Sequence, residues 1–180
     1  DHAYCSSVCC MYAIKDAVVA KEHADYDLDC AIFYMDMRTY GKDFELYYNQ
    51  AREEHGVRFI RSRVHTIDPI PGSDDLLIQY SDEKGNIHEE QFDMVVLSVG
   101  MESSPEVIEL ARKLDIDLTE GEFCQTDPFY PVAASKEGIY VCGAFQGPKD
   151  IPQSVMEASG AACAAGADLS EARGSETRSK

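Results

Sequence analysis

Cys30-Ala-Ile-Phe-Tyr-Met-Asp-Met-Arg38 is the stretch that decides the fold. It is almost continuously apolar over the length of one strand, which is typical of a strand covered on both faces in a parallel sheet. The preceding run, Val8 to His23, has apolar residues near helical spacing and predicts a helix. A helix followed by a buried strand favours an alternating α/β architecture.

The residues after this strand continue the alternation. Asp43 is the predicted N-cap of a helix from Phe44 to His55, and Gly56 is its predicted C-terminal stop. Three further strands are predicted, the last two as an antiparallel β-hairpin: Val57 to Val64, Leu76 to Tyr80 and Ile87 to Phe92.

The C-terminal half repeats a pattern of strand, glycine and helix. Asp93 to Gly100 gives the strongest strand pattern in the chain, and Ser104 is the predicted cap of a helix from Pro105 to Leu114. After the irregular stretch Phe123 to Ala134, two more elements are predicted: a short buried strand, Gly138 to Gly143, and a small-residue helix, Ser154 to Asp168.

Composition and charge exclude several classes of function. The 33 acidic residues outnumber the 16 basic ones, and the net charge of -17 disfavours binding to nucleic acid or to an anionic membrane. The sequence has neither a membrane-spanning apolar run nor a signal-peptide pattern. Seven cysteines, an odd number, do not fit a secreted disulfide framework, so we expect a cytoplasmic protein. Because the chain starts at Asp1 rather than Met and carries candidate ligand cysteines within its first residues, we expect it to be a fragment of a larger protein.

Three of the seven cysteines, Cys5, Cys9 and Cys10, fall within six residues, and the strongly helix-forming run Met11 to Glu22 follows at once. Thiolates are soft ligands that suit iron-sulfur clusters or zinc, and a helix N-terminus favours their negative charge. The alternative is a set of structural or redox thiols, and the motif supplies three of the four ligands that a cluster normally needs. The isolated cysteines are expected to fill core space: Cys30, Cys124, Cys142 and Cys163.

Two glycine-terminated strands are candidates for a cofactor site. Ligands of open α/β sheets bind beyond the carboxyl ends of strands, and Gly100 permits close approach there. After Gly143, a helix N-terminus near Ser154 offers N–H groups to an electron-rich ligand. The alternatives are an ordinary turn at Gly100 and a tightly packed corner without ligand at Gly143.

Three segments resemble the flavoprotein A subunit of heterodisulfide reductases: Tyr4 to Lys15, Gly56 to Arg61 and Gly138 to Ser159. The similarity covers about residues 4 to 169, and the broader resemblance is to thioredoxin-reductase-like flavoproteins. It implies a three-layer α/β, dinucleotide-binding-like fold with a parallel sheet and a β-hairpin. We expect the chain to divide into four segments. Residues 1–27 form a cluster-ligand segment with the first helix, and residues 28–100 a nucleotide-binding-like domain without the Gly-rich loop. Residues 101–169 form a return segment that contacts FAD, and residues 170–180 a disordered tail.

The resemblance implies roles for individual residues. Cys5, Cys9 and Cys10 would ligate a [4Fe-4S] cluster beside FAD, with the fourth cysteine upstream of Asp1. Lys15 falls where the family places a lysine near the reactive N5 edge of the flavin. The implied FAD contacts are Gly100, Gly143, Ala144, Phe145, Asp150, Ile151, Gln153 and Ser154.

Two departures from the wider flavoprotein pattern matter. Ala144 stands where the usual Gly-Asp pair has its acid, which leaves Asp150, Gln153 and Ser154 as candidates for polar contact. The FAD-binding glycine fingerprint is not in the chain, so we expect the fragment alone to hold FAD poorly and to be inactive.

The function implied is electron transfer between FAD and [4Fe-4S] clusters in an electron-bifurcating oxidoreductase of methanogenesis, for reduction of a CoM-S-S-CoB-type disulfide and of ferredoxin. Implied partners are heterodisulfide reductase subunits B and C, a hydrogenase or formate dehydrogenase, and ferredoxin. In an ordinary nucleotide domain a Gly-rich turn before the first helix cradles pyrophosphate. Here the cysteines stand in that place, so we expect the cluster to occupy the position that NAD(P)H would use.

Two rival functions fit parts of the same pattern. One is an ordinary flavin disulfide reductase with redox cysteines, which the adjacent Cys9 and Cys10 disfavour because neighbouring residues form a strained disulfide. The other is a non-enzymatic docking domain with a zinc or structural thiol site.

Overall fold

The computed structural model describes residues 2–170 and 172. It divides into two compact units, one formed by residues 9–99 and the other by the residues up to Val8 together with those from Gly100 onward. These two units do not match the predicted division, whose segments end at residues 27, 100 and 169. That division stays a prediction. Most of the predicted disordered tail, residues 171 and 173–180, lies outside the described residues.

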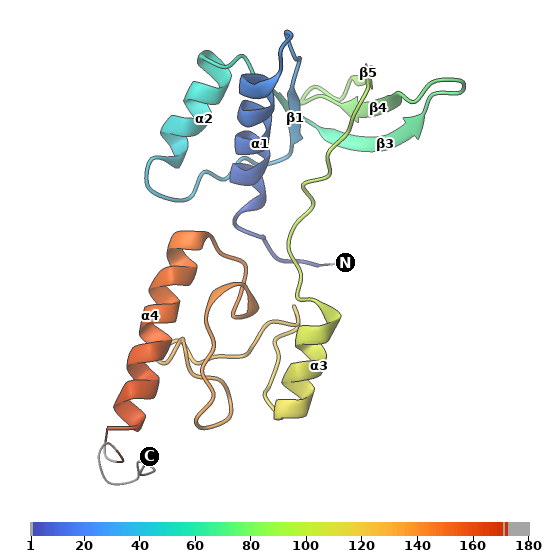
Figure 1. Ribbon diagram of the computed structural model, residues 1–180. Coiled ribbons are helices and arrows are strands. Elements are labelled where there is room, and N and C mark those ends of the chain that lie inside the picture. The colour runs from blue at the N-terminus through green and yellow to red at the C-terminus, as the bar shows by residue number, and fades with distance from the viewer. Residues whose placement is uncertain (1, 171, 173–180) are drawn as a thin grey trace. The chain divides into compact units, whose positions relative to one another are not determined.

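The unit of residues 9–99 begins with alternating helices and strands (Figure 1). They are α1 (Cys9–His23), β1 (Ala31–Tyr34), α2 (Phe44–Glu53) and β2 (Arg58–Arg61). β1 and β2 pair in parallel with Ala31 opposite Arg58, as the buried strand pattern predicts. The two helices pack beside this pair, and the core between them consists of Ile14, Val18, Ala51 and Val57. The α/β prediction is confirmed.

An antiparallel sheet completes this unit. Its strands are β3 (Arg63–Pro69), β4 (Leu76–Ser81) and β5 (Ile87–Phe92), in the order β3-β4-β5. The predicted hairpin is confirmed as β4 and β5. The predicted strand Val57 to Val64 is instead divided at Ser62, which is buried and whose N–H bonds to the carbonyl of Tyr34, 2.9 Å away. The chain therefore leaves the parallel pair there and enters the antiparallel sheet.

The segment Asp93 to Gly100 does not form the predicted strand. Its apolar side chains are exposed, Val99 by 86% and Met94 by 74%, and within the described residues it pairs with no other strand. A strand exists only through hydrogen bonds to a neighbour, and the apolar pattern does not itself provide one. The prediction is wrong for this segment.

The second unit contains α3 (Pro105–Leu114), the short 3-10 helix η1 (Gly143–Phe145) and α4 (Ile151–Asp168). Its core consists of Ala111, Ile116, Cys124 and Val141. The predicted strand Gly138 to Gly143 is wrong: Tyr140 forms an isolated bridge with Ala133, and the backbone then turns into η1. The backbone groups of this stretch bond to irregular neighbours instead of a strand: the carbonyl of Ile139 accepts the N–H of Ala134 at 3.0 Å, and the N–H of Val141 bonds to the carbonyl of Val132 at 2.8 Å.

The helices α2 and α3 lie where the sequence predicts them, but the side chains predicted to cap them do not form capping hydrogen bonds. α3 has the predicted bounds, but the side chain of Ser104 makes no capping hydrogen bond. Asp43 precedes α2 in a left-handed conformation, with φ of 65°, and also makes no side-chain cap. Among the described residues, no helix is both long enough and apolar enough to cross a membrane.

Arg58 joins the parallel pair to the antiparallel sheet. Its guanidinium donates to both carboxylate oxygens of Asp29, at 3.0 and 2.9 Å, and to Oε1 of Glu90 on β5, at 2.6 Å. The bonds from Arg58 lower the pKa of Asp29. This bidentate geometry stabilises the ionised carboxylate.

We predict that Arg58→Gln lowers the free energy of unfolding by about 1 kcal/mol at pH 7, since Asp29 is largely exposed and the contribution is screened. The pKa of Asp29 is lower in the folded chain than its unfolded value of about 4, so the stabilisation is present above that pH and is lost as the pH falls through the folded value. Urea unfolding at pH 7 and pH 3, with Arg63→Gln as the exposed, charge-matched control, tests this. An equal loss at both pH values contradicts it.

Candidate functional site

The candidate site is the turn of η1 and the start of α4. Gly143 has φ of 72°, a left-handed conformation that favours glycine, and a Cβ there would be only in ordinary contact with Oγ of Ser154, at 3.7 Å. The turn is held from both sides, because Val141 N–H bonds to Val132 O and Cys124 N–H bonds to Phe145 O, each at 2.8 Å. The glycine is thus needed for the backbone conformation.

α4 begins at Ile151, three residues before the predicted start at Ser154, because Asp150 caps it. The Asp150 carboxylate accepts a bond from the N–H of Gln153 at 2.8 Å, and the Gln153 side chain accepts one from the N–H of Asp150 at 3.2 Å. This reciprocal capping box satisfies two backbone donors. Ser154 turns its hydroxyl back onto the carbonyl of Asp150, at 2.8 Å.

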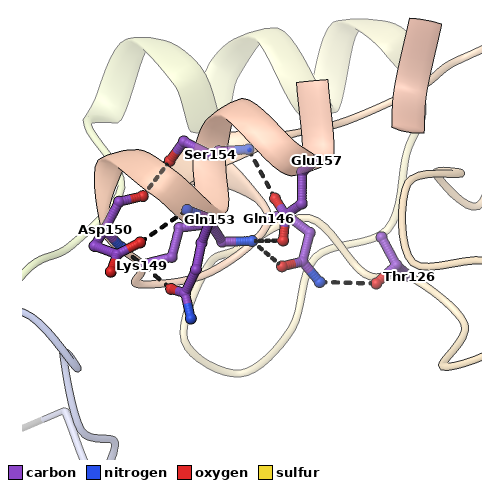
Figure 2. Close-up of polar contacts among 8 residues, drawn as sticks. Thr126, Gln146, Lys149, Asp150, Gln153, Ser154 and Glu157 are labelled. Atoms are coloured by element: carbon purple, nitrogen blue, oxygen red, sulfur yellow. Dashed lines mark hydrogen bonds and ion pairs between the residues drawn. The ribbon is translucent and has the colours of Figure 1, made fainter. Parts of the chain in front are cut away.

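A buried ion pair lies beneath this turn (Figure 2). Lys149, only 8% exposed, donates through Nζ to Oε1 of Glu157 and to Oε1 of Gln146. The second oxygen of Glu157 accepts the N–H of Gly143 at 2.9 Å, and Gln146 continues to Oγ1 of Thr126 at 3.0 Å. Buried charges need such partners, because an uncompensated one costs several kcal/mol. One carboxylate therefore holds both the glycine turn and the loop before α4.

The charges of this site limit what it can bind. Asp150 and Glu157 carry two negative charges against the one positive charge of Lys149. In the first turn of α4, Pro152 has no N–H, and the N–H groups of Gln153 and Ser154 both bond to Asp150. Among the described residues, the N–H of Ile151 is therefore the remaining backbone donor of this turn. A phosphate would meet net negative charge here. The residues fit an uncharged, hydrogen-bonding part of a flavin instead.

Cys9 and Cys10 open α1, in the unit of residues 9–99. The thiol of Cys10 points to the carbonyl of Asp36 at 3.8 Å, and the carbonyl of Cys9 accepts the hydroxyl of Ser98 at 3.0 Å. The first turn of α1 has no acidic residue, so no carboxylate there would repel an anionic ligand at the start of the helix.

Cys5 belongs to the other unit, where its sulfur accepts the N–H of Ser7 at 3.4 Å. Among the described residues no group of three His, Cys, Asp or Glu side chains is gathered as a metal site. The donor set nevertheless fits a cluster chemically, since it consists of thiols and one sulfur already accepts a backbone hydrogen bond. The ligand assignment of Cys5, Cys9 and Cys10 stays a prediction.

Lys15 is exposed on α1, five residues beyond Cys10. That spacing places it roughly 140° around the helix axis from Cys10. Lys15 and Cys10 are therefore on different faces of α1, while Ile14 and Val18 face the core.

The structure brings one part of the predicted site together. Gly143, Ala144, Phe145, Asp150, Ile151, Gln153 and Ser154 lie along η1 and the start of α4. Gly100 belongs to the same unit, but the group against it is the hydroxyl of Ser6. Sequence reasoning missed Thr126, Gln146, Lys149 and Glu157, and neither burial nor pairing of a lysine has a local sequence signal.

Comparison with known proteins adds a family match. The model of the family described as "Pyridine nucleotide-disulphide oxidoreductase" matches residues 28–162. This agrees with the α/β architecture and with the resemblance to thioredoxin-reductase-like flavoproteins.

Relatives resemble nearly the whole chain. A protein of Archaeoglobus profundus, named as like the A subunit of heterodisulfide reductase, is 45% identical over 91% of this chain and 23% of its own length. The A subunit of the H2/formate:CoB-CoM heterodisulfide, ferredoxin reductase of Methanococcus maripaludis is 43% identical over 93% and 26%. The iron-sulfur A subunit of the CoB-CoM heterodisulfide reductase of Methanocaldococcus jannaschii is 42% identical over 89% and 25%. The chain spans about a quarter of the length of these relatives, and the predicted resemblance is confirmed.

We predict that Lys149→Met and Glu157→Gln each lower the free energy of unfolding by about 3 kcal/mol, because each leaves one charge or polar partner buried without compensation. The double variant Lys149→Met, Glu157→Gln should recover part of that loss, since no charge then remains buried. Denaturant unfolding of the three variants measures this coupling.

The exposed pair Lys113 and Glu109, 2.7 Å apart on α3, is the matched control. Removing its lysine should cost about 0.5 kcal/mol or less. A similarly small effect of Lys149→Met would show that the Lys149 and Glu157 pair does not hold the turn.

Proposed function

Because this chain belongs to the pyridine nucleotide-disulphide oxidoreductase family, we propose that it is the electron-transfer part of an oxidoreductase like the A subunit of heterodisulfide reductase. In this proposal Cys5, Cys9 and Cys10 ligate a [4Fe-4S] cluster, and η1 with the start of α4 contacts FAD. Bound there, FAD would exchange electron pairs for single electrons, and the cluster would carry single electrons.

The observation that carries the proposal is the set of three thiols at the N-terminal end of α1: Cys5 precedes the helix, and Cys9 and Cys10 are its first two residues. An ordinary nucleotide-binding domain has a Gly-rich turn before its first helix, where backbone N–H groups cradle pyrophosphate. In this proposal the cysteines take that place, and the N-terminal end of α1 favours the negative charge of a cluster held at Cys9 and Cys10. We therefore propose that electrons enter or leave through the cluster, in the position that NAD(P)H would otherwise use.

The start of α4 supports the flavin part of the proposal. Its residues present backbone and amide groups in a fixed arrangement, because Asp150 caps the helix and Glu157 holds Gly143. The net charge of Lys149, Asp150 and Glu157 favours an uncharged edge of the flavin over its pyrophosphate. Ala144, in place of the usual acid, makes no carboxylate contact, so Gln153 and Ser154 are the proposed polar contacts.

Lys15 is proposed as a cation near the reactive edge of the flavin. A positive charge there stabilises the reduced, anionic flavin and raises its reduction potential. Lys15 lies on α1 five residues after the proposed ligand Cys10 and on a different face, so the same helix would present the cluster thiolates on one face and this cation on another.

The proposed substrate, donors and acceptor follow the names of the relatives, and the partner subunits follow the family resemblance. Those names include H2, formate, ferredoxin, and the CoB-CoM heterodisulfide. We propose that the chain works with subunits B and C of a heterodisulfide reductase, with a hydrogenase or formate dehydrogenase as donor and ferredoxin as a further acceptor. Reduction of the disulfide takes two electrons and two protons and yields two thiols.

We predict that Cys9→Ser or Cys10→Ser in the anaerobically prepared holoprotein lowers the iron content by about four atoms per chain, with an equal loss of acid-labile sulfide. Cys163→Ser, which changes an exposed thiol on α4, is the control and should keep the iron. Iron, sulfide and flavin analysis measures this. Zinc without sulfide in the unaltered holoprotein would reject the cluster in favour of a structural metal site.

We also predict that Lys15→Met lowers the reduction potential of the flavin, because the reduced anion loses a nearby cation, and that Lys15→Arg restores most of it. A spectroscopic redox titration measures the potential, and Lys42→Met, which removes an exposed lysine before α2, is the control. An unchanged potential in Lys15→Met would place Lys15 away from the flavin.

A further inference from the structure

The segment that carries Cys5 is anchored through the buried side chain of Ser6. Ser6 is only 6% exposed, and its Oγ accepts the N–H of Met101 at 2.7 Å. The Ser6 carbonyl in turn accepts the N–H of Val8 at 2.6 Å. Both the side chain and the backbone of Ser6 are therefore held by hydrogen bonds within one unit of the chain.

Gly100 makes room for this anchor. A Cβ at Gly100 would lie 2.7 Å from Oγ of Ser6, a distance that real Cβ contacts essentially never show, and the φ of Gly100 is 127°, where L side chains are strained. Two separate demands therefore require glycine at this position. The group that approaches Gly100 in the structure is the Ser6 hydroxyl.

Tyr4 fixes the segment on the other side of Cys5. Its hydroxyl donates to the carbonyl of Met101 at 2.9 Å, and its ring packs edge-on against Phe123 with centroids 5.3 Å apart. Gly121 lies so close that a Cβ there would come within 3.0 Å of the Tyr4 ring. Tyr4 and Ser6 thus bond to the two backbone groups of the same residue, Met101, and Cys5 lies between them in the chain.

The sulfur of Cys5 is oriented by the turn that follows. Ser7 adopts a left-handed conformation, with φ of 58°, that is uncommon for a residue other than glycine. In this conformation its N–H donates to Sγ of Cys5 at 3.4 Å. Hydrogen bonds to cluster sulfurs are one of the factors that set the reduction potential of an iron-sulfur cluster.

We propose that Tyr4, Ser6 and Gly100 are positioning residues for Cys5, which fix its sulfur and the Ser7 N–H bond for cluster ligation and thereby tune the potential of the cluster. This inference rests on the proposed function. It assigns Gly100 a role in holding the cysteine segment, in addition to the FAD contact predicted for it.

The test measures the cluster in the anaerobic holoprotein rather than its activity. We expect Ser6→Ala and Gly100→Ala to release iron to a chelator about tenfold faster or more than the unaltered protein, because they disturb the support of a ligand. We also expect both to change the EPR spectrum and the midpoint potential of the reduced cluster. Gly138→Ala, a positive-φ glycine of the same unit with no atom within 4 Å of its Cβ, controls for backbone strain and should leave the spectrum unchanged.

The double variant Ser6→Ala, Gly100→Ala separates this role from general destabilisation. Removing the Ser6 hydroxyl removes the atom that the new Cβ would strike, so the effects on iron release should be less than additive. Tyr4→Phe keeps the ring and removes only the bond to Met101. It should shift the cluster potential and speed iron release by a smaller factor, and it carries the test if Gly100→Ala does not fold.

The outcomes separate the two proposals. If Ser6→Ala and Tyr4→Phe leave iron release, EPR spectrum and potential unchanged while Cys5→Ser loses the cluster, the positioning role is wrong and the proposed function stands. If the unaltered holoprotein contains no iron-sulfur cluster, the proposed function fails and the positioning role fails with it.

Discussion

The buried ion pair of Lys149 and Glu157 is the interaction on which the candidate flavin site depends. One carboxylate neutralises the lysine with one oxygen and holds the backbone N–H of Gly143 with the other. The lysine in turn fixes Gln146, which continues to Thr126. Because neither charge can lose its partner without a large cost, the turn, the loop and the start of α4 are held in one arrangement. A cofactor would meet a surface formed in advance, which lowers the ordering cost of binding.

Local sequence patterns were sufficient for the helices and the hairpin. α1, α2, α3 and the β4-β5 pair lie where periodicity and turn residues predict them. The strand predictions are wrong for Asp93 to Gly100 and for Gly138 to Gly143. The pairing of strands is a non-local property, and an apolar run does not show whether a neighbouring strand is present to pair with it. α4 starts earlier than predicted for a different reason: Asp150 and Gln153, which are predicted only as candidates for polar contact with FAD, also form the capping box that begins the helix.

The sequence predicts chemistry for the candidate site, and that chemistry stays a prediction. The spacing of Cys5, Cys9 and Cys10 predicts soft-metal ligands, with structural or redox thiols as the alternative. The support around them does not show in the sequence, since Ser6 resembles any small turn residue until its hydroxyl is seen against Gly100 and Met101. The same is true of Lys149, because burial of a lysine is decided by tertiary contacts alone.

These features suggest how one chain can separate two tasks. In the proposed function, Cys5, Cys9 and Cys10 supply thiolates at the N-terminal end of α1, and Ser6 anchors the segment of Cys5 through a hydrogen bond to Met101 that a side chain at residue 100 would disrupt. The start of α4, with its capping box and buried ion pair, is the surface proposed to contact an uncharged flavin edge. Each task depends on a few buried polar contacts in which donors and acceptors are paired.

The most direct test of the central claim is to locate iron in crystals of the anaerobic holoprotein by anomalous scattering at the iron edge. The account predicts an iron peak within bonding distance of the sulfurs of Cys5, Cys9 and Cys10. Iron found only at other cysteines, or a zinc peak at these three, would contradict it.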